Sequence, residues 1–148
     1  MSMTKKVLKL EFEREFDFLI VGLISAYKDF RLCYELNQAI NINFLRNDDV
    51  VVPAGKPESS TRHSHFSCAG RDHEMYHVIS NRDKDGTGHF ITEMRNIDYF
   101  LIVAESSTNY EMSELVKKLR GINIVSGAYE IETSEMKSAE AFLLFLEG

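Results

Sequence analysis

The 148-residue sequence has few residues of several kinds, and each shortage excludes a class of protein. Two cysteines are too few for a small domain held together by disulfides. Two prolines and eight glycines exclude a collagen-like chain. The longest apolar stretch, residues 18–24, is far shorter than the about 20 residues that cross a bilayer as a helix.

Positive charge is also scarce. Lys and Arg total 17 against 23 Asp and Glu, which gives a formal net charge of −6. Binding to nucleic acid or to an anionic membrane depends on cations that neutralise phosphates, and the basic residues form no stripe along the chain. We therefore expect neither nucleic acid nor a membrane as a partner.

The N-terminal segment and the cysteines bear on the compartment. Charged residues interrupt every apolar run before Phe18, and Glu15 and Asp17 precede that run, which is not the arrangement of a signal peptide. Cys33 and Cys68 form no CxxC pair and sit among apolar or small neighbours. The sequence therefore predicts a cytoplasmic protein with two buried, reduced thiols.

What the chain does contain is typical of one globular domain. Apolar residues make up 44% and charged residues 27%, and the length fits a single domain over residues 1–148. Residues 46–62 hold both prolines and a Ser-Ser-Thr run, so we expect a flexible loop there. Within it, Val50–Val52 is the one segment that favours a short strand.

Apolar patterning predicts the strands. Alternation predicts a half-buried strand over residues 7–12, whereas continuous apolar runs predict buried strands at Phe18–Ile24 and Tyr99–Val103. Shorter strands are expected at 42–44 and within 122–131, and the apolar run 141–146 slightly favours a strand over a helix. Turn residues at 70–72 predict a hairpin between 65–69 and 75–79, and those at 83–88 predict a second turn.

Two helices are predicted between strands. Ser25 is expected to cap a helix over 26–39. Helical spacing assigns its apolar face to Tyr27, Phe30, Cys33, Tyr34, Leu36 and Ile40.

The second helix is expected to begin at a capping box formed by Thr108 and Glu111 and to end at Gly121. Its apolar face comprises Met112, Leu115, Val116 and Leu119, and its last turn is basic, with Lys117, Lys118 and Arg120.

The order of these elements predicts an α+β fold, with a mainly antiparallel sheet and two main helices packed on one face. Residues 97–131 form a strand–helix–strand unit, as in half of a ferredoxin-like fold.

His73-Glu74-Met75-Tyr76-His77 matches the H-E-x-x-H pattern of zinc hydrolases. That chemistry needs a helix, because only there do side chains four residues apart reach the same metal ion. Here a turn precedes the motif and strand-forming residues follow it, so a chance match within a strand is the favoured interpretation.

All five histidines lie between positions 63 and 89, namely His63, His65, His73, His77 and His89. Across the predicted hairpin, His63 or His65 would face His73 or His77, which leaves a surface metal site or a pH-sensitive patch open beside a plain polar sheet face. The turn at 83–88 resembles a calcium loop but misses its essential glutamate by one residue.

No phosphate-binding loop, nucleophile elbow or dinucleotide-binding turn is present, and the isolated acids Asp17, Asp29, Glu35 and Glu93 form no pair in the sequence. We therefore assign no catalytic residue, no metal ligand and no cofactor.

Residues 91–101, ITEMRNIDYFL, resemble the signature I-P-E-x-x-x-V-D-Y of the IPExxxVDY family of small bacterial proteins. Residues 29–37, 78–81, 128–131 and 137–138 with the apolar tail extend the similarity over most of the chain. Thr92 replaces the signature proline and Ile97 the valine. The resemblance implies a bacterial origin and marks Glu93, Asp98 and Tyr99 as positions of interest, but it brings no activity, cofactor or catalytic role.

Three hypotheses about function follow. The favoured one is a non-enzymatic binding or protein-interaction module, with an unknown protein partner or a homodimer formed through a sheet edge or the apolar tail. The alternatives are a metal-dependent hydrolase that uses His73, Glu74 and His77, and a small-ligand regulatory domain built on the strand–helix–strand half.

Overall fold

The computed structural model describes residues 18–53, 60–86, 88–107 and 110–132, together with Phe142 and Leu146. Within them an antiparallel sheet of six strands has the order β2-β5-β6-β7-β1-β8. Its strands are β1 (Phe18–Ile24), β2 (Leu45–Arg46), β5 (His65–Ala69), β6 (Met75–Ser80), β7 (Tyr99–Ala104) and β8 (Gly127–Ile131). The α+β prediction is confirmed, whereas the strand expected at residues 7–12 lies outside the described residues.

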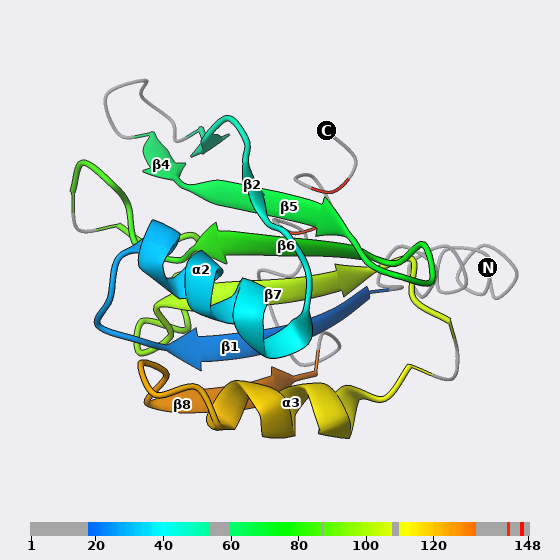
Figure 1. The fold of residues 1–148 in the computed structure, drawn as a ribbon. Helices are drawn as coiled ribbons and strands as arrows, with labels where there is room; N and C mark the ends of the chain where they lie inside the picture. The colour runs from blue at the N-terminus through cyan, green and yellow to red at the C-terminus, as the bar shows by residue number, and fades with distance from the viewer. Residues whose placement is uncertain are drawn as a thin grey trace, which may run out of the picture.

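Two helices and a small second sheet complete the fold. The helices are α2 (Asp29–Ile40) and α3 (Met112–Arg120), which lie in front of the sheet in Figure 1. Strands β3 (Val50–Val52) and β4 (Thr61–His63) pair with each other as a separate antiparallel ribbon. The segment expected to be a loop, 46–62, therefore contains β3 and the beginning of β4.

The unit β7–α3–β8 crosses over one strand. Strands β7 and β8 both pair antiparallel with β1, so they run parallel to each other with β1 between them. This arrangement is the split strand–helix–strand half of a ferredoxin-like topology, as the sequence indicated. It places Tyr99 at the start of β7 opposite Leu23 near the end of β1.

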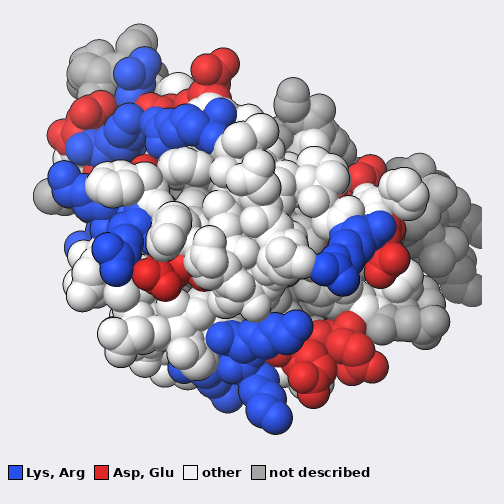
Figure 2. Space-filling view, in the orientation of Figure 1, with Lys and Arg blue, Asp and Glu red and all other residues white. Residues whose placement is uncertain are grey.

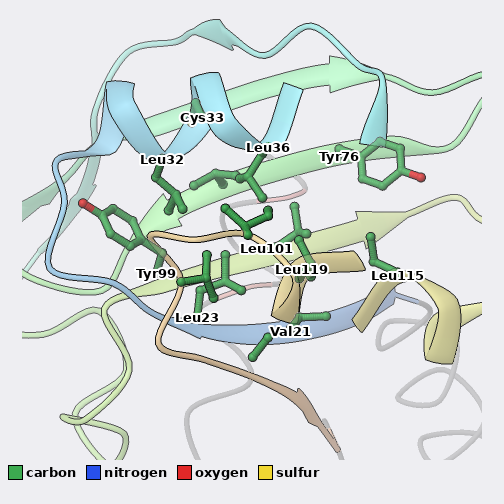
Figure 3. Packing of buried hydrophobic residues seen from close by; sticks show 14 of the residues in the cluster. Val21, Leu23, Leu32, Cys33, Leu36, Tyr76, Tyr99, Leu101, Leu115 and Leu119 are labelled. Carbon is green, nitrogen blue, oxygen red and sulfur yellow. The ribbon is translucent and has the colours of Figure 1, made fainter. Parts of the chain in front are cut away.

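Both helices cover the same face of the sheet, where they form the main core. Leu32, Cys33 and Leu36 of α2 and Leu115 and Leu119 of α3 point toward the sheet in Figure 3. From the strands they meet the fully buried side chains of Val21, Leu23 and Leu101. Each fully buried side chain of this size contributes about 1.5–3 kcal/mol to folding, so this layer is the main source of stability.

The opposite face of the sheet is covered by the segment between β6 and β7. Phe90, Ile91 and Ile97 pack there on Ile20, Ile79, Phe100 and Ile102, and Phe142 joins them with its ring centroid 5.1 Å from that of Phe100. Asn81, which is fully buried, holds the segment in place. Its amide donates to the carbonyls of Met94 and Ile97, and its Oδ1 accepts the N–H of Ile91.

Helix α2 differs from the prediction at its start and in the face it buries. It begins at Asp29 with Lys28 at the N-cap position, so the predicted cap by Ser25 is wrong. The hydroxyl of Ser25 instead donates a hydrogen bond to the carbonyl of Ile124 at 2.8 Å. The buried side chains are Leu32, Cys33 and Leu36, whereas Tyr27, Phe30 and Tyr34 of the predicted apolar face are exposed.

Helix α3 buries all four residues of its predicted face and carries its three basic residues in the last turn. It begins one turn later than expected: Glu111 is the N-cap residue, and no side chain in the described part of the chain caps the first turn. The predicted capping box is therefore wrong at Glu111, and Thr108 lies outside the described residues. Gly121 ends the helix in a right-handed conformation, with φ −81°.

Three further boundaries differ from the prediction. The strand expected at 42–44 is displaced to Leu45–Arg46, because Phe44 turns into the core. The strand within 122–131 begins at Gly127. Phe142 and Leu146, the described residues of the apolar run 141–146, are helical, so the expected strand is wrong there.

Neither α2 nor α3, the helices in the described part of the chain, has the length and apolar character needed to cross a bilayer.

Candidate functional site

A buried carboxylate lies where β7 begins. Asp98, which is 9% exposed, accepts the N–H of Ser25 through Oδ2 at 2.9 Å. Its Oδ1 accepts two bonds from Arg82, from Nε at 2.9 Å and from Nη2 at 2.8 Å. Charge-assisted bonds of this kind are among the stronger ones in proteins. Asp98 therefore ties the end of β1 to the residues that follow β6.

A cleft of about 450 Å³ opens beside this carboxylate. Tyr99 forms part of its wall and donates its hydroxyl to the carbonyl of Tyr27 at 2.7 Å. Burial raises the pKa of Tyr99 well above its usual range, so this phenol stays protonated as a donor. The charged side chains that line the cleft are Lys28, Arg82 and Asp98.

Two of the three positions marked by the sequence resemblance therefore come together. Asp98 and Tyr99 lie side by side in this cleft. Glu93 does not line it; that residue is exposed in the turn that follows Ile91. Ser25 and Arg82, which complete the arrangement, could not be identified from the sequence, because they are 73 and 16 residues away from Asp98 along the chain.

An aromatic surface adjoins the same cleft. The exposed fractions are 49% for Tyr27, 65% for Phe30 and 58% for Tyr34, large values for aromatic side chains. Phe30 and Tyr34 lie one turn apart on the outer side of α2, whereas Tyr27 precedes the helix and also lines the cleft. Figure 2 shows that the centre of this side of the molecule is uncharged, with charged side chains gathered around it.

The H-E-x-x-H motif does not have the geometry of a zinc hydrolase. His73 lies in the hairpin turn with a φ of 70°, and residues 75–80 form β6. The carboxylate of Glu74 is buried under that turn, where it accepts the N–H of Asp72 at 3.3 Å. His73 and His77 are therefore not on one helical face, and the described residues contain no group of three or more metal-ligating side chains.

Two of the histidines do meet across the hairpin. Nε2 of His65 lies 3.0 Å from Nδ1 of His77, and the rings are inclined by 24°. Burial, with smaller effects of His77 and of the Arg46 charge, lowers the pKa of His65 to about 4, and burial lowers the pKa of His77 to about 4. The pair is therefore neutral at pH 7, with one ring donating and the other accepting.

His63 and the polar turn after β6 form hydrogen bonds that stabilise the local structure. His63 is fully buried; its Nδ1 donates to the carbonyl of Ser80 at 2.9 Å, and its Nε2 meets the hydroxyl of Thr61 at 2.8 Å. In the turn at 83–88, Oδ1 of Asp83 accepts the N–H of Arg62, which holds the pKa of Asp83 below its usual range. The carboxylate that would begin a calcium loop is thus used by the backbone.

A second cleft, of about 420 Å³, was not identified from the sequence. It lies between the hairpin turn, the end of α2 and the start of α3, and Glu74, Tyr76 and Tyr110 line it. The two tyrosine hydroxyls are 2.8 Å apart. Burial raises the pKa of both phenols, so both remain protonated at neutral pH.

Both cysteines are free, as predicted. Cys33 is buried, as expected, whereas Cys68 is half-buried, so the prediction of a buried thiol is wrong at that position. Burial raises the pKa of both thiols, which makes them poor nucleophiles and metal ligands at neutral pH.

Comparison of the chain with protein-family models, with curated proteins and with solved structures finds no match. The resemblance to the IPExxxVDY family therefore stays a prediction that rests on the quoted residues, and so does the bacterial origin that it implies.

Proposed function

We propose that this protein is a non-enzymatic interaction module that associates with a second copy of itself through the outer side of α2 and the residue Tyr27 that precedes it. The observation that carries the proposal is the exposure of Tyr27, Phe30 and Tyr34. Contiguous exposed aromatic side chains are typical of interfaces, because they bring a large apolar area at a small cost in side-chain entropy.

Charged residues on the same helix favour a second copy of this chain as the partner that covers the aromatic surface. Arg31 and Glu35 form an ion pair of 3.3 Å one turn apart, beside the aromatic residues. In a two-fold symmetric pair of antiparallel helices, each residue i meets residue j of the partner and j meets i. Arg31 of one copy then faces Glu35 of the other on the same flank, so the surface is complementary to itself.

The area is consistent with a modest interface. Aromatic side chains bury about 150–250 Å² each, so the three exposed ones offer roughly 300 Å² per copy. A stable interface needs about 800 Å² per partner. The polar residues beside the stripe must therefore contribute the remainder, and we expect an equilibrium between monomer and dimer rather than an obligate dimer.

Charge reversal tests the arrangement. Arg31→Glu makes the flank wholly acidic and Glu35→Arg makes it wholly basic, so each variant alone should repel itself. The double variant R31E/E35R restores complementarity, and so should an equimolar mixture of the two single variants. Sedimentation equilibrium over a range of protein concentrations measures the dissociation constant of each, with Lys117→Glu on α3 as a charge-matched control.

The outcomes are distinct. Weakened dimers of both single variants, with recovery in the mixture, support the proposal. A wild-type protein that stays monomeric throughout overturns it, and so does a dimer that is insensitive to both single variants.

Of the two alternatives, the structure disfavours the hydrolase and leaves a cleft for the regulatory domain. The hydrolase hypothesis requires His73 and His77 on one helix, and they lie in a turn and a strand. The regulatory hypothesis requires a ligand site near the strand–helix–strand half, and the cleft at Asp98 is at that position.

A further inference from the structure

The cleft beside Asp98 carries an excess of positive charge that the fold does not use. Three charged side chains line it, and the charge of Asp98 is balanced by Arg82, to which it is bonded. The third is Lys28, which forms no ion pair with any residue that the structure describes. Counted over the described residues that line it, the cleft therefore has one uncompensated positive charge.

Arg82 is held in a fixed position at the cleft. Its Nε and Nη2 both bind Oδ1 of the buried Asp98, so the guanidinium is anchored on one edge. A guanidinium has five N–H donors, and the side chain of Arg82 is still 66% exposed. Its remaining donors have no partner among the described residues and can bind a ligand, and the anchoring reduces the entropy that binding would otherwise cost.

The walls of the cleft suit an apolar body attached to the anion. Tyr27 and Tyr99 line it together with Ile24, and the bond from Tyr99 to the Tyr27 carbonyl connects the two tyrosines across the start of α2. A volume of about 450 Å³ falls within the usual range of small-molecule sites, about 300–1,000 Å³.

We propose that the cleft formed by Lys28, Arg82, Tyr27 and Tyr99 binds a small organic anion, a carboxylate or phosphate group attached to an aromatic or apolar body. The oxyanion lies between the free donors of Arg82 and the ammonium group of Lys28, and the body lies against the tyrosines. The site does not depend on self-association, since every residue in it belongs to one chain.

The test uses phenyl phosphate and benzoate as probes, with benzyl alcohol as a neutral analogue and inorganic phosphate as an anion without a body. Isothermal titration calorimetry gives the dissociation constants, and amide chemical shifts locate the site. Both organic anions should perturb the amides of Ser25, Tyr27, Lys28 and Ser126. The organic anion that binds more tightly shows whether the site prefers a phosphate or a carboxylate group. Inorganic phosphate should bind more weakly than either organic anion.

Lys28→Gln keeps the buried Asp98–Arg82 pair and so preserves the fold. It should weaken the binding of the stronger probe about five-fold, the usual contribution of one exposed charge contact. Lys117→Gln on α3 serves as the matched control and should leave binding unchanged. The proposal is overturned if benzyl alcohol binds as tightly as the organic anions, or if K28Q binds the stronger probe with the wild-type affinity. It is also overturned if neither organic anion binds at a concentration of about 5 mM, the weak end of specific association.

Performing the titrations with the R31E variant separates the two proposals. Binding of the anions to that variant with an unchanged dissociation constant shows that the cleft acts in the monomer, whatever the outcome for self-association.

Discussion

The imidazole of His65 and that of His77 are joined by one hydrogen bond of 3.0 Å, although 12 residues separate them along the chain. One ring must donate and the other accept, so the accepting nitrogen must be unprotonated. Protonation of the accepting nitrogen would break the bond, and protonation of either ring would place a charge in a half-buried position.

This pair predicts a loss of stability in acid. An unfolded histidine has a pKa near 6.5, whereas both folded values are about 4. Between these values the unfolded chain binds protons that the folded chain does not. The free energy of unfolding therefore stays constant above about pH 6.5 and decreases as the pH falls toward 4. His63, whose pKa burial also lowers, adds to the same trend.

Each unit of difference in pKa corresponds to about 1.4 kcal/mol, and partial exposure of the rings reduces this. We expect His65 and His77 together to account for about 2–3 kcal/mol of the loss. Urea unfolding at a series of pH values measures the decrease, which should be smaller in the double variant H65Q/H77Q. His73→Gln, which alters an exposed histidine, should keep the wild-type profile, and an unchanged slope in the double variant would contradict the prediction.

The second prediction concerns Asp98. Asp98→Ala removes the acceptor of the Ser25 N–H and leaves the guanidinium of Arg82 without its partner. Because the carboxylate is buried, we expect a loss of about 2–4 kcal/mol in the free energy of unfolding, measured by urea denaturation. Glu35→Gln, which breaks an exposed ion pair, should cost less than about 0.5 kcal/mol. Equal effects of the two changes would show that Asp98 is no more than a surface contact.

The third prediction compares the two faces of α2. Leu36→Ala removes a fully buried side chain from the core and should destabilise the protein by about 2–5 kcal/mol. Tyr34→Ala removes a side chain that is 58% exposed, so we expect less than about 1 kcal/mol. Thermal and urea unfolding at low protein concentration, where self-association does not contribute, measure both. The opposite order of the two effects would mean that α2 packs on its aromatic side.

Much of the fold was predictable because its sequence patterns are local. The apolar run at 18–24 and the run from Tyr99 gave the buried strands β1 and β7. The turn at 70–72 gave the hairpin, in which Ala69 pairs with Met75. The helical spacing of apolar residues predicted the buried face of α3 correctly, because its opposite face is charged and only one side of that helix can be buried.

The face of α2 was not predictable in the same way. Apolar side chains at helical spacing occur on both of its sides, with Leu32, Cys33 and Leu36 on one and Phe30 and Tyr34 on the other. Periodicity alone cannot decide between two such stripes. The sheet decides, because the aliphatic stripe fills the space above Leu23 and Leu101, as Figure 3 shows.

The candidate site was predictable only in part. The resemblance to a family marked Asp98 and Tyr99, and the structure places both in one cleft. Their partners Ser25 and Arg82 carry no sequence pattern, since hydroxyl and guanidinium groups are common on protein surfaces. Only the pairing of β1 with β7 brings Ser25 to the carboxylate.

The sequence by itself determined the kind of domain, most of its strands and turns, and the absence of a helical context for His73 and His77. These depend on interactions between residues close in the chain. The tertiary structure decided which side of α2 is exposed, which histidines meet and what Asp98 binds. Those outcomes depend on the order β6-β7-β1 in the sheet, which joins residues as far apart as Ser25 and Asp98.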